Sequence, residues 1–154
     1  MSPSTHEVTE IDAQPRWVAG VTVPVPIGRV AQYFGAALDQ VYAAGRAGKI
    51  VLDGQNIFIY HPPIDGNLTV DFCVGTGGPF AAIGAVSSLQ TPAGRAARTV
   101  HVGDYGGIGG ANRAILDWCR ANGRTIAGPS WEVYGHMGPG PELPRTEIYY
   151  LLRD

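Results

Sequence analysis

The sequence reads as two copies of one pattern, at residues 8–74 and 86–152. Each copy contains a strand-like segment, an apolar helical stripe and two further strand-like segments separated by a turn. An internal repeat constrains the fold more than any single motif, because both copies must form the same supersecondary unit. The corresponding residues at the ends of the copies are Val8, Ile11 and Pro15 with Val86, Leu89 and Pro92, and Phe72 and Val74 with Tyr150 and Leu152.

Apolar residues at helical spacing predict one main helix in each copy. The first runs from about Gly28 to Ala47. The second carries its stripe from Ile108 to Cys119, and Asn122-Gly123 supplies the left-handed stop expected just past a helix end. Continuous or alternating β-branched and aromatic runs predict strands at Trp17–Val23, Asn56–Tyr60, Leu68–Val74, Arg98–Val102, Trp131–Tyr134 and Thr146–Leu152, with edge strands at about Val8–Ala13 and Ala85–Gln90.

The connections between these elements favour an α+β fold. Proline and glycine in His61–Gly66 and Gly135–Pro144 are typical of hairpin connections, and Gly75–Gly84 is the joint between the halves. We therefore expect duplicated β-α-β-β modules that form a curved, mostly antiparallel sheet, with two main helices packed on it and a central pocket near the pseudo-twofold axis. With 154 residues, 45% of them hydrophobic, the chain is expected to form a single domain, 1–154.

The charge balance excludes a nucleic-acid-binding surface. Lysine and arginine total 11 against 13 acidic residues, and only Arg95 and Arg98 come close to forming a cluster. Phosphate binding requires a basic stripe, which is missing here. The first residues do not resemble a secretory signal, and no apolar run is long enough to cross a membrane. We expect a cytoplasmic protein that does not associate with membranes.

The residues that commonly bind metals or cofactors are dispersed along the chain. Cys73 lies in a predicted strand and Cys119 in a predicted helix, so buried thiols are expected rather than a disulfide or metal site. The glycine-rich segments after Val74 and Tyr105 match neither a P-loop nor a dinucleotide fingerprint. We therefore expect no metal and no cofactor. The histidines, which have no metal-ligand spacing, are His6, His61, His101 and His136.

Glu132 is the residue at which the two copies differ most informatively. Residues 130–134 correspond to residues 56–60, and this alignment sets Glu132 against Phe58. Side-chain alternation along a strand places Glu132 on the same face as Tyr134. A carboxylate removed from water must raise its pKa, find a donor or bind a cation. Two interpretations remain open: a solvated or arginine-paired glutamate beside core aromatics, or a charged aromatic pocket for flat, apolar, often cationic molecules.

Several motifs of the second copy, taken in order, resemble the GyrI-like small-molecule-binding domain. They are the segment Thr99–Tyr105, a helix containing Trp118, Asn122-Gly123, Trp131–Tyr134 and Thr146–Tyr149. The resemblance extends from about Val8 to Leu152. Domains of this family also form the effector-binding part of multidrug-sensing transcription regulators of the AraC and MerR types.

The resemblance implies an aromatic pocket with Glu132 as its central acid, which meets cationic drugs in the regulators. Some stand-alone members are reported to hydrolyse electrophilic, cyclopropane-bearing toxins. In such an enzyme Glu132 would be the general base, and Tyr105 and Tyr134 the catalytic partners. This sequence departs from the family pattern in the glycine-rich segment Gly106–Gly110 and in Val23–Ile27 of the first copy. The ligand-binding residues expected from the resemblance and the repeat are Glu132, Tyr134, Tyr105, Tyr149, Phe58 and Tyr60.

Three functions are compatible with these features. The first is a stand-alone protein that binds a hydrophobic or cationic small molecule. The second is a hydrolase that uses Glu132 as a general base. The third, suggested by the family name, is a protein-contact inhibitor of a DNA topoisomerase, for which no protein partner can be named. Only a few polar residues precede Val8, and no helix-turn-helix fits there, so we expect no direct contact with nucleic acid.

Overall fold

The computed structural model describes residues 6–135 and 143–154. His136 and most of the connection between Gly135 and Pro144 lie outside the described residues. The elements are β1 (Thr9–Ala13), β2 (Trp17–Pro26), a 3-10 helix η1 (Val30–Gln32), α1 (Phe34–Arg46), β3 (Leu52–Ile64), β4 (Asn67–Thr76), β5 (Ser87–Gln90), β6 (Gly94–Val102), a second 3-10 helix η2 (Tyr105–Gly107), α2 (Ile108–Ala121), β7 (Ile126–Tyr134) and β8 (Arg145–Leu152).

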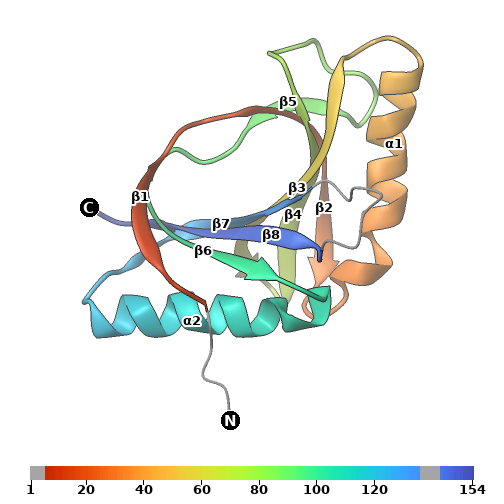
Figure 1. The fold of residues 1–154 in the computed structure, drawn as a ribbon. Helices are drawn as coiled ribbons and strands as arrows, with labels where there is room; N and C mark the ends of the chain where they lie inside the picture. The colour runs from red at the N-terminus through yellow and green to blue at the C-terminus, as the bar shows by residue number, and fades with distance from the viewer. Residues whose placement is uncertain (1–5, 136–142) are drawn as a thin grey trace.

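The named strands form one antiparallel sheet in the order β1-β6-β8-β7-β3-β4-β2-β5. The order reads symmetrically about the central pair β3 and β7 (Figure 1). The first strand of each half pairs with a strand of the other half: β1 pairs with β6, and β5 pairs with β2. The two halves are therefore joined both at the centre of the sheet and at its two edges.

Both helices pack on the same face of the sheet. Helix α1 contacts β2 and β4, and α2 contacts β6 and β8. Their buried stripes include Leu38 and Val41 in α1 and Ile115 in α2. The opposite face carries a separate apolar cluster around Ile57 and Trp131. The predicted α+β fold, with a curved antiparallel sheet and two main helices, is confirmed (Figure 1).

Helix α1 begins later than the sequence pattern predicts. The predicted start, Gly28, has φ of 86°, which is a left-handed conformation that a right-handed helix cannot contain. The chain then forms the short η1 before α1 begins at Phe34. The predicted end near Ala47 agrees with the observed one, where Ala47 is the C-cap. The turn at Gly28 separates the end of β2 from the helical segment.

Strands β2 and β3 are both longer than predicted. β2 continues through Pro24 and Pro26, which pair with β4 beyond the end of β5. A proline is tolerated there because this part of β2 is an edge, where a missing N–H breaks no ladder bond. β3 continues to Ile64, and the hairpin turn contains only Asp65 and Gly66. Both turn residues have positive φ, as a type I′ hairpin turn requires.

Neither helix of the described chain is long and apolar enough to span a membrane.

Candidate functional site

The site is centred on the β3–β7 pair, where the two halves of the sheet meet. Phe58 and Glu132 are direct cross-strand partners. These are the same two residues that the alignment of the copies sets against each other. In an antiparallel pair related by a pseudo-twofold axis, equivalent residues face each other only at the axis. Glu132 therefore lies at the centre of the molecule, in a strand flanked on both sides by other strands.

Glu132 is buried and held by two tyrosine hydroxyls. Its residue is 8% exposed. Tyr60 donates a hydrogen bond to Oε1 over 3.0 Å, and Tyr134 donates a short one to the same oxygen. Within residues 6–135 and 143–154, no hydrogen bond reaches Oε2 and no arginine pairs with Glu132. The glutamate is thus neither solvated at a sheet edge nor arginine-paired, which were the properties expected from the simpler interpretation.

Burial keeps both tyrosines in their neutral, donating form. Burial is the main cause that raises the pKa of Tyr60, and the charge of Glu132 adds to it. Burial is also the largest cause that raises the pKa of Tyr134, and the neighbouring Tyr60 and Glu132 raise it further. An ionised phenol would face a carboxylate inside an apolar site, which is unfavourable at low dielectric. At neutral pH both hydroxyls therefore act as donors to Oε1.

A cavity of about 430 Å³ opens beside Glu132, between the helical segments of both halves and the centre of the sheet. Its volume lies within the range usual for small-molecule sites, roughly 300–1,000 Å³. The ring of Phe58 lies 4.9 Å from that of Tyr134 and 5.9 Å from that of Phe34. Tyr105 meets Tyr134 edge to face at 5.8 Å. The lining residues are Val30, Ala31, Phe34, Leu38, Asn56, Phe58, Tyr60, Tyr105, Ile108, Glu132 and Tyr134.

The cavity contains one acidic group and no basic group. Of the described residues that line it, none is a lysine, arginine or histidine. Hydrogen bonds to a charged acceptor contribute about 1.5–3 kcal/mol each, whereas removing a carboxylate from water costs several kcal/mol per ion. The two hydroxyl donors therefore contribute a free energy comparable to the cost of burying the Glu132 carboxylate.

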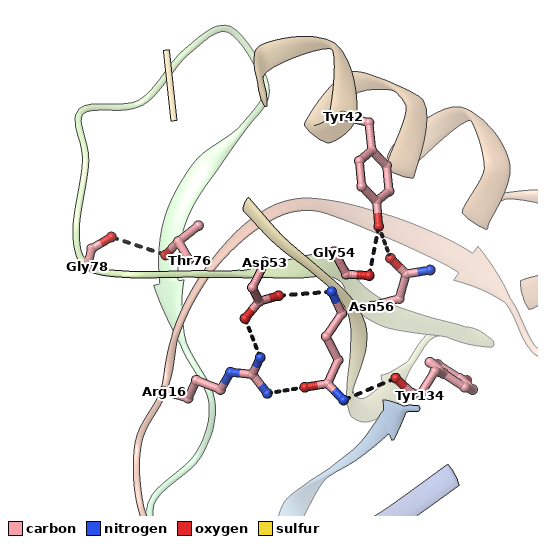
Figure 2. A network of polar contacts seen from close by, with 9 residues as sticks. Arg16, Tyr42, Asp53, Gly54, Asn56, Thr76, Gly78 and Tyr134 are labelled. Carbon is pink, nitrogen blue, oxygen red and sulfur yellow. Dashed lines mark hydrogen bonds and ion pairs between the residues drawn. The ribbon is translucent and has the colours of Figure 1, made fainter. Parts of the chain in front are cut away.

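Polar contacts on both sides of the sheet anchor the start of β3, which leads to the site (Figure 2). On the helix side, Tyr42 of α1 donates a hydrogen bond to Asn56 over 2.5 Å. On the other side, Arg16 donates to Gln55 over 2.7 Å, and Gln55 donates to the backbone carbonyl of Tyr134 over 3.3 Å. Arg16 also forms an ion pair with Asp53 at 2.5 Å. These contacts link α1, β3 and β7 next to the cavity.

The structure brings five of the six predicted ligand-binding residues together and separates the sixth. Tyr149 points to the opposite face of the sheet, because its cross-strand partner is Trp131 rather than Glu132. Its ring stacks on Trp131 at 4.9 Å, and its hydroxyl donates to Glu147 over 2.5 Å. Tyr149 is therefore not an aromatic partner of Glu132. The five residues that line the cavity are Glu132, Tyr134, Tyr105, Phe58 and Tyr60.

The prediction missed the contribution of the helical segments to the cavity. Phe34 and Leu38 belong to the stripe that predicts α1, and Ile108 belongs to the stripe that predicts α2. Helical periodicity identifies the inward face of a helix, but not whether that face meets a core or a cavity. The sequence pattern identifies Asn56 only as the beginning of a strand. The signal that could identify Asn56 as a cavity residue is its polar side chain at the start of a buried strand, on the same face as Phe58.

No metal centre is evident in the described part of the chain. It contains no group of three or more histidine, cysteine, aspartate or glutamate side chains that could hold an ion. Cys73 and Cys119 are free and buried. Burial raises the pKa of the Cys73 thiol, with a smaller contribution from Asp71. The chemistry available at the cavity is therefore that of one carboxylate, phenolic hydroxyls and aromatic rings.

The model of the GyrI-like small molecule binding domain matches residues 6–153, which is nearly the whole chain. This protein belongs to the GyrI-like family. Among curated proteins, none matches the sequence significantly. The small-molecule-binding role that defines this family agrees with a central cavity.

Solved structures of similar fold include one determined with a bound small molecule. The EcmrR C-terminal domain has a TM-score of 0.81 and 17% identity, over 97% of this GyrI-like chain and 99% of that one. SAV2435 bound to tetraphenylphosphonium has a TM-score of 0.63 and 14% identity, over 96% and 94% of the two chains. A hydrolase from Listeria innocua has a TM-score of 0.59 and 11% identity, over 96% and 92%. At these identities the likeness concerns the fold alone.

Proposed function

We propose that this GyrI-like protein binds hydrophobic cations in the cavity beside Glu132. The observation that carries the proposal is a buried carboxylate that receives two hydroxyl donors on one oxygen, within a cavity lined by rings and by no basic residue. A desolvated cation over an aromatic face gains about 2 kcal/mol. The negative charge of Glu132 adds attraction without requiring a directional hydrogen bond. The similarly folded SAV2435, bound to tetraphenylphosphonium, supports this ligand class.

The composition of the wall also bears on selectivity. Phe34, Phe58 and Tyr105 present ring surface from α1, β3 and η2, respectively. Rings accept many shapes, because they offer apolar area and a negative face rather than fixed donors. The pocket should therefore discriminate by charge and size more than by hydrogen-bonding pattern. We infer a binder of several related cations rather than of one metabolite.

A calorimetric titration tests the proposal. Tetraphenylphosphonium and a neutral molecule of similar shape are titrated into the wild-type protein and into Glu132→Gln. We expect the wild type to prefer the cation by about 30-fold, equivalent to about 2 kcal/mol, and the variant to lose that preference. Equal affinity of the wild type for both molecules would refute the assignment of Glu132 as the cation-binding charge. Tyr149→Phe, which alters a tyrosine on the opposite face of the sheet that does not line the cavity, serves as the control.

The hydrolase is the second candidate, and one observation favours it. Tyr105 lines the cavity and its hydroxyl makes no hydrogen bond to any described residue, so it is available to an electrophile. Tyr134 is less available, because its hydroxyl already donates to Glu132. Glu132 would then activate a water for attack. Incubation with an electrophilic, cyclopropane-bearing compound and mass spectrometry of the products would reveal turnover, which Glu132→Gln and Tyr105→Phe should both reduce.

The open cavity argues against the topoisomerase-inhibitor alternative. That alternative would be supported by a groove filled with side chains, whereas about 430 Å³ remains open beside Glu132. A protein partner is not required to satisfy any group in the site. We therefore consider inhibition of a topoisomerase by protein contact less well supported than either small-molecule function.

A further inference from the structure

Asn56 brings an amide group to the wall of the cavity. The register of β3 against β4 is irregular between Leu52 and Asn56, and regular pairing resumes at Asn56. Alternation along β3 then places Asn56 on the same face as Phe58, which also lines the cavity. Because Phe58 is the direct cross-strand partner of Glu132, Asn56 is a diagonal neighbour of the carboxylate. Diagonal neighbours in an antiparallel pair lie roughly 7–8 Å apart.

The hydroxyl of Tyr42 fixes the orientation of the Asn56 amide. It lies 2.5 Å from the amide of Asn56 and 3.4 Å from the backbone carbonyl of Gly54. Hydrogen bonds between two oxygens can be as short as about 2.5 Å, whereas those from nitrogen to oxygen begin at about 2.7 Å. The atom nearest the hydroxyl is therefore Oδ1, which accepts from Tyr42. The amide nitrogen points away from Tyr42 (Figure 2).

The amide nitrogen of Asn56 makes no hydrogen bond to any described residue. Asn56 is only half-buried, and it lines the cavity, so a molecule inside the cavity can accept from Nδ2. The fold uses the same atom differently in the other asparagines, each of which donates from it to a backbone carbonyl of its own segment: Asn67, Asn112 and Asn122. Two N–H donors at Asn56 are thus left for a ligand.

The cavity therefore has a negative side and a donating side. Glu132 carries the negative charge, and the N–H hydrogens of Asn56 carry partial positive charge, so they attract a lone pair and disfavour a cation beside them. Tyr105 is the other donor without a described partner, but it is 50% exposed and no hydrogen bond fixes its hydroxyl. A donor that is already oriented loses less freedom when a ligand binds. The amide of Asn56 is oriented by Tyr42.

We propose that Asn56 is a specificity-determining residue, which selects those hydrophobic cations that also carry a hydrogen-bond acceptor, such as a carbonyl oxygen, several bonds from the charge. This role rests on the proposed function of the cavity and narrows its ligand class. Charge remains the larger source of selectivity, because one hydrogen bond between neutral groups changes Kd by roughly 2- to 12-fold.

Two matched phosphonium ions test the role of Asn56 by calorimetric titration. (4-Oxopentyl)triphenylphosphonium carries a methyl ketone, and (4-methylpent-4-enyl)triphenylphosphonium has a methylene group in place of the ketone oxygen. Both ions have a permanent charge and nearly the same shape. Removing the ketone from water carries a cost that is the same for every variant, so the informative quantity is the ratio of the two affinities. We expect the ratio of ketone to alkene affinity to fall about fivefold in Asn56→Leu.

Three further variants identify the donor. Asn122→Leu is the matched control, because Asn122 lies at the end of α2 away from the cavity and donates to the carbonyl of Trp118 over 2.8 Å. Tyr105→Phe removes the other free donor, and both variants should leave the ratio unchanged. If Asn56→Leu fails to fold, Tyr42→Phe frees the amide to rotate without altering a cavity-lining residue, and it should lower the ratio in the same direction.

Infrared spectroscopy detects the hydrogen bond itself. The ketone is labelled with ¹³C at its carbonyl, so that its stretching band is separated from the bands of the protein. A hydrogen bond lowers the stretching frequency of a carbonyl, and we expect a lower frequency for the ketone bound to the wild type than for the ketone bound to Asn56→Leu. Equal frequencies would contradict donation from Asn56.

The outcomes distinguish this role from the proposed function. Tetraphenylphosphonium has no acceptor, so it should bind the wild type and Asn56→Leu with similar Kd. If the phosphonium ions bind but the affinity ratio is the same in wild type and Asn56→Leu, the role of Asn56 is overturned and the proposed function stands. A ratio that falls in Tyr105→Phe and not in Asn56→Leu would also overturn it, with Tyr105 as the donor. If none of the phosphonium ions binds the wild type, the proposed function and the role of Asn56 both fail.

Discussion

Replacing Tyr60 by phenylalanine should reveal how strongly the buried charge of Glu132 depends on its donors. The Tyr60 hydroxyl donates to Oε1 over 3.0 Å and is one of two donors on that oxygen. A hydrogen bond to a charged group contributes about 1.5–3 kcal/mol, and one to a neutral group about 0.5–1.5 kcal/mol. Tyr60→Phe should therefore lower the free energy of unfolding by about 2 kcal/mol when position 132 is glutamate, and by about 1 kcal/mol when it is glutamine.

Urea unfolding of four proteins measures this difference: wild type, Tyr60→Phe, Glu132→Gln and the double variant. The expected coupling is about 1 kcal/mol, which is within reach of a double-mutant cycle for residues in contact. Tyr42→Phe is the matched control, because its hydroxyl donates to the neutral side chain of Asn56 over 2.5 Å and the charge that raises its pKa, after burial, is that of Asp53 rather than that of Glu132. Its cost should be the same in both backgrounds. If Tyr60→Phe costs equally with glutamate and with glutamine at position 132, the hydroxyls do not stabilise a buried charge.

Two further changes probe regions outside the cavity. Gly20→Ala would place a Cβ 2.5 Å from Sγ of Cys73, and overpacking should cost about 1–3 kcal/mol of the free energy of unfolding; Cys73→Ala in the same chain should restore most of it. Hydrogen bonds from Arg124, and then Arg95, lower the pKa of Glu10 below its ordinary value of 4.5, so Glu10 contributes stability above that pH that is lost as the pH falls through the lowered pKa. The melting temperature of Glu10→Gln should therefore lie below that of wild type at neutral pH and converge with it in acid, and failure to converge would contradict this role.

Much of the fold could be predicted from the sequence, because local patterns largely determine helices and strands. The apolar stripe from Ile108 to Cys119 and the helix stop at Asn122-Gly123 predict α2 with nearly its observed bounds. The start of α1 could not be predicted as well, because the left-handed turn at Gly28 depends on how β2 leaves the sheet. The extension of β2 through its prolines depends on β5 ending early, which is a property of the whole sheet.

The alternation of side chains along a strand explains where the structure places Tyr134 and Tyr149 relative to Glu132. It correctly places Glu132 and Tyr134 on one face of β7, and it also places Tyr149 on the other face of β8. The expectation that Tyr149 is a partner of Glu132 comes from the family resemblance and not from this alternation. In the folded chain its ring packs on Trp131, so the local rule was the better guide.

The sequence by itself determined that the chain is built from two related halves and that an acid replaces an aromatic residue in one of them, because periodicity and substitution can be seen along a single chain. Only the tertiary structure decided that Glu132 faces Phe58 at the axis, that Tyr60 from the other half donates to it, and that His101 contacts the backbone carbonyl of Asp104 beside Tyr105. The contacts of Glu132 join residues more than 70 positions apart, and the contact of His101 depends on a turn whose course is set by packing. Such contacts arise from the register of strands and the seating of turns, which no local pattern specifies.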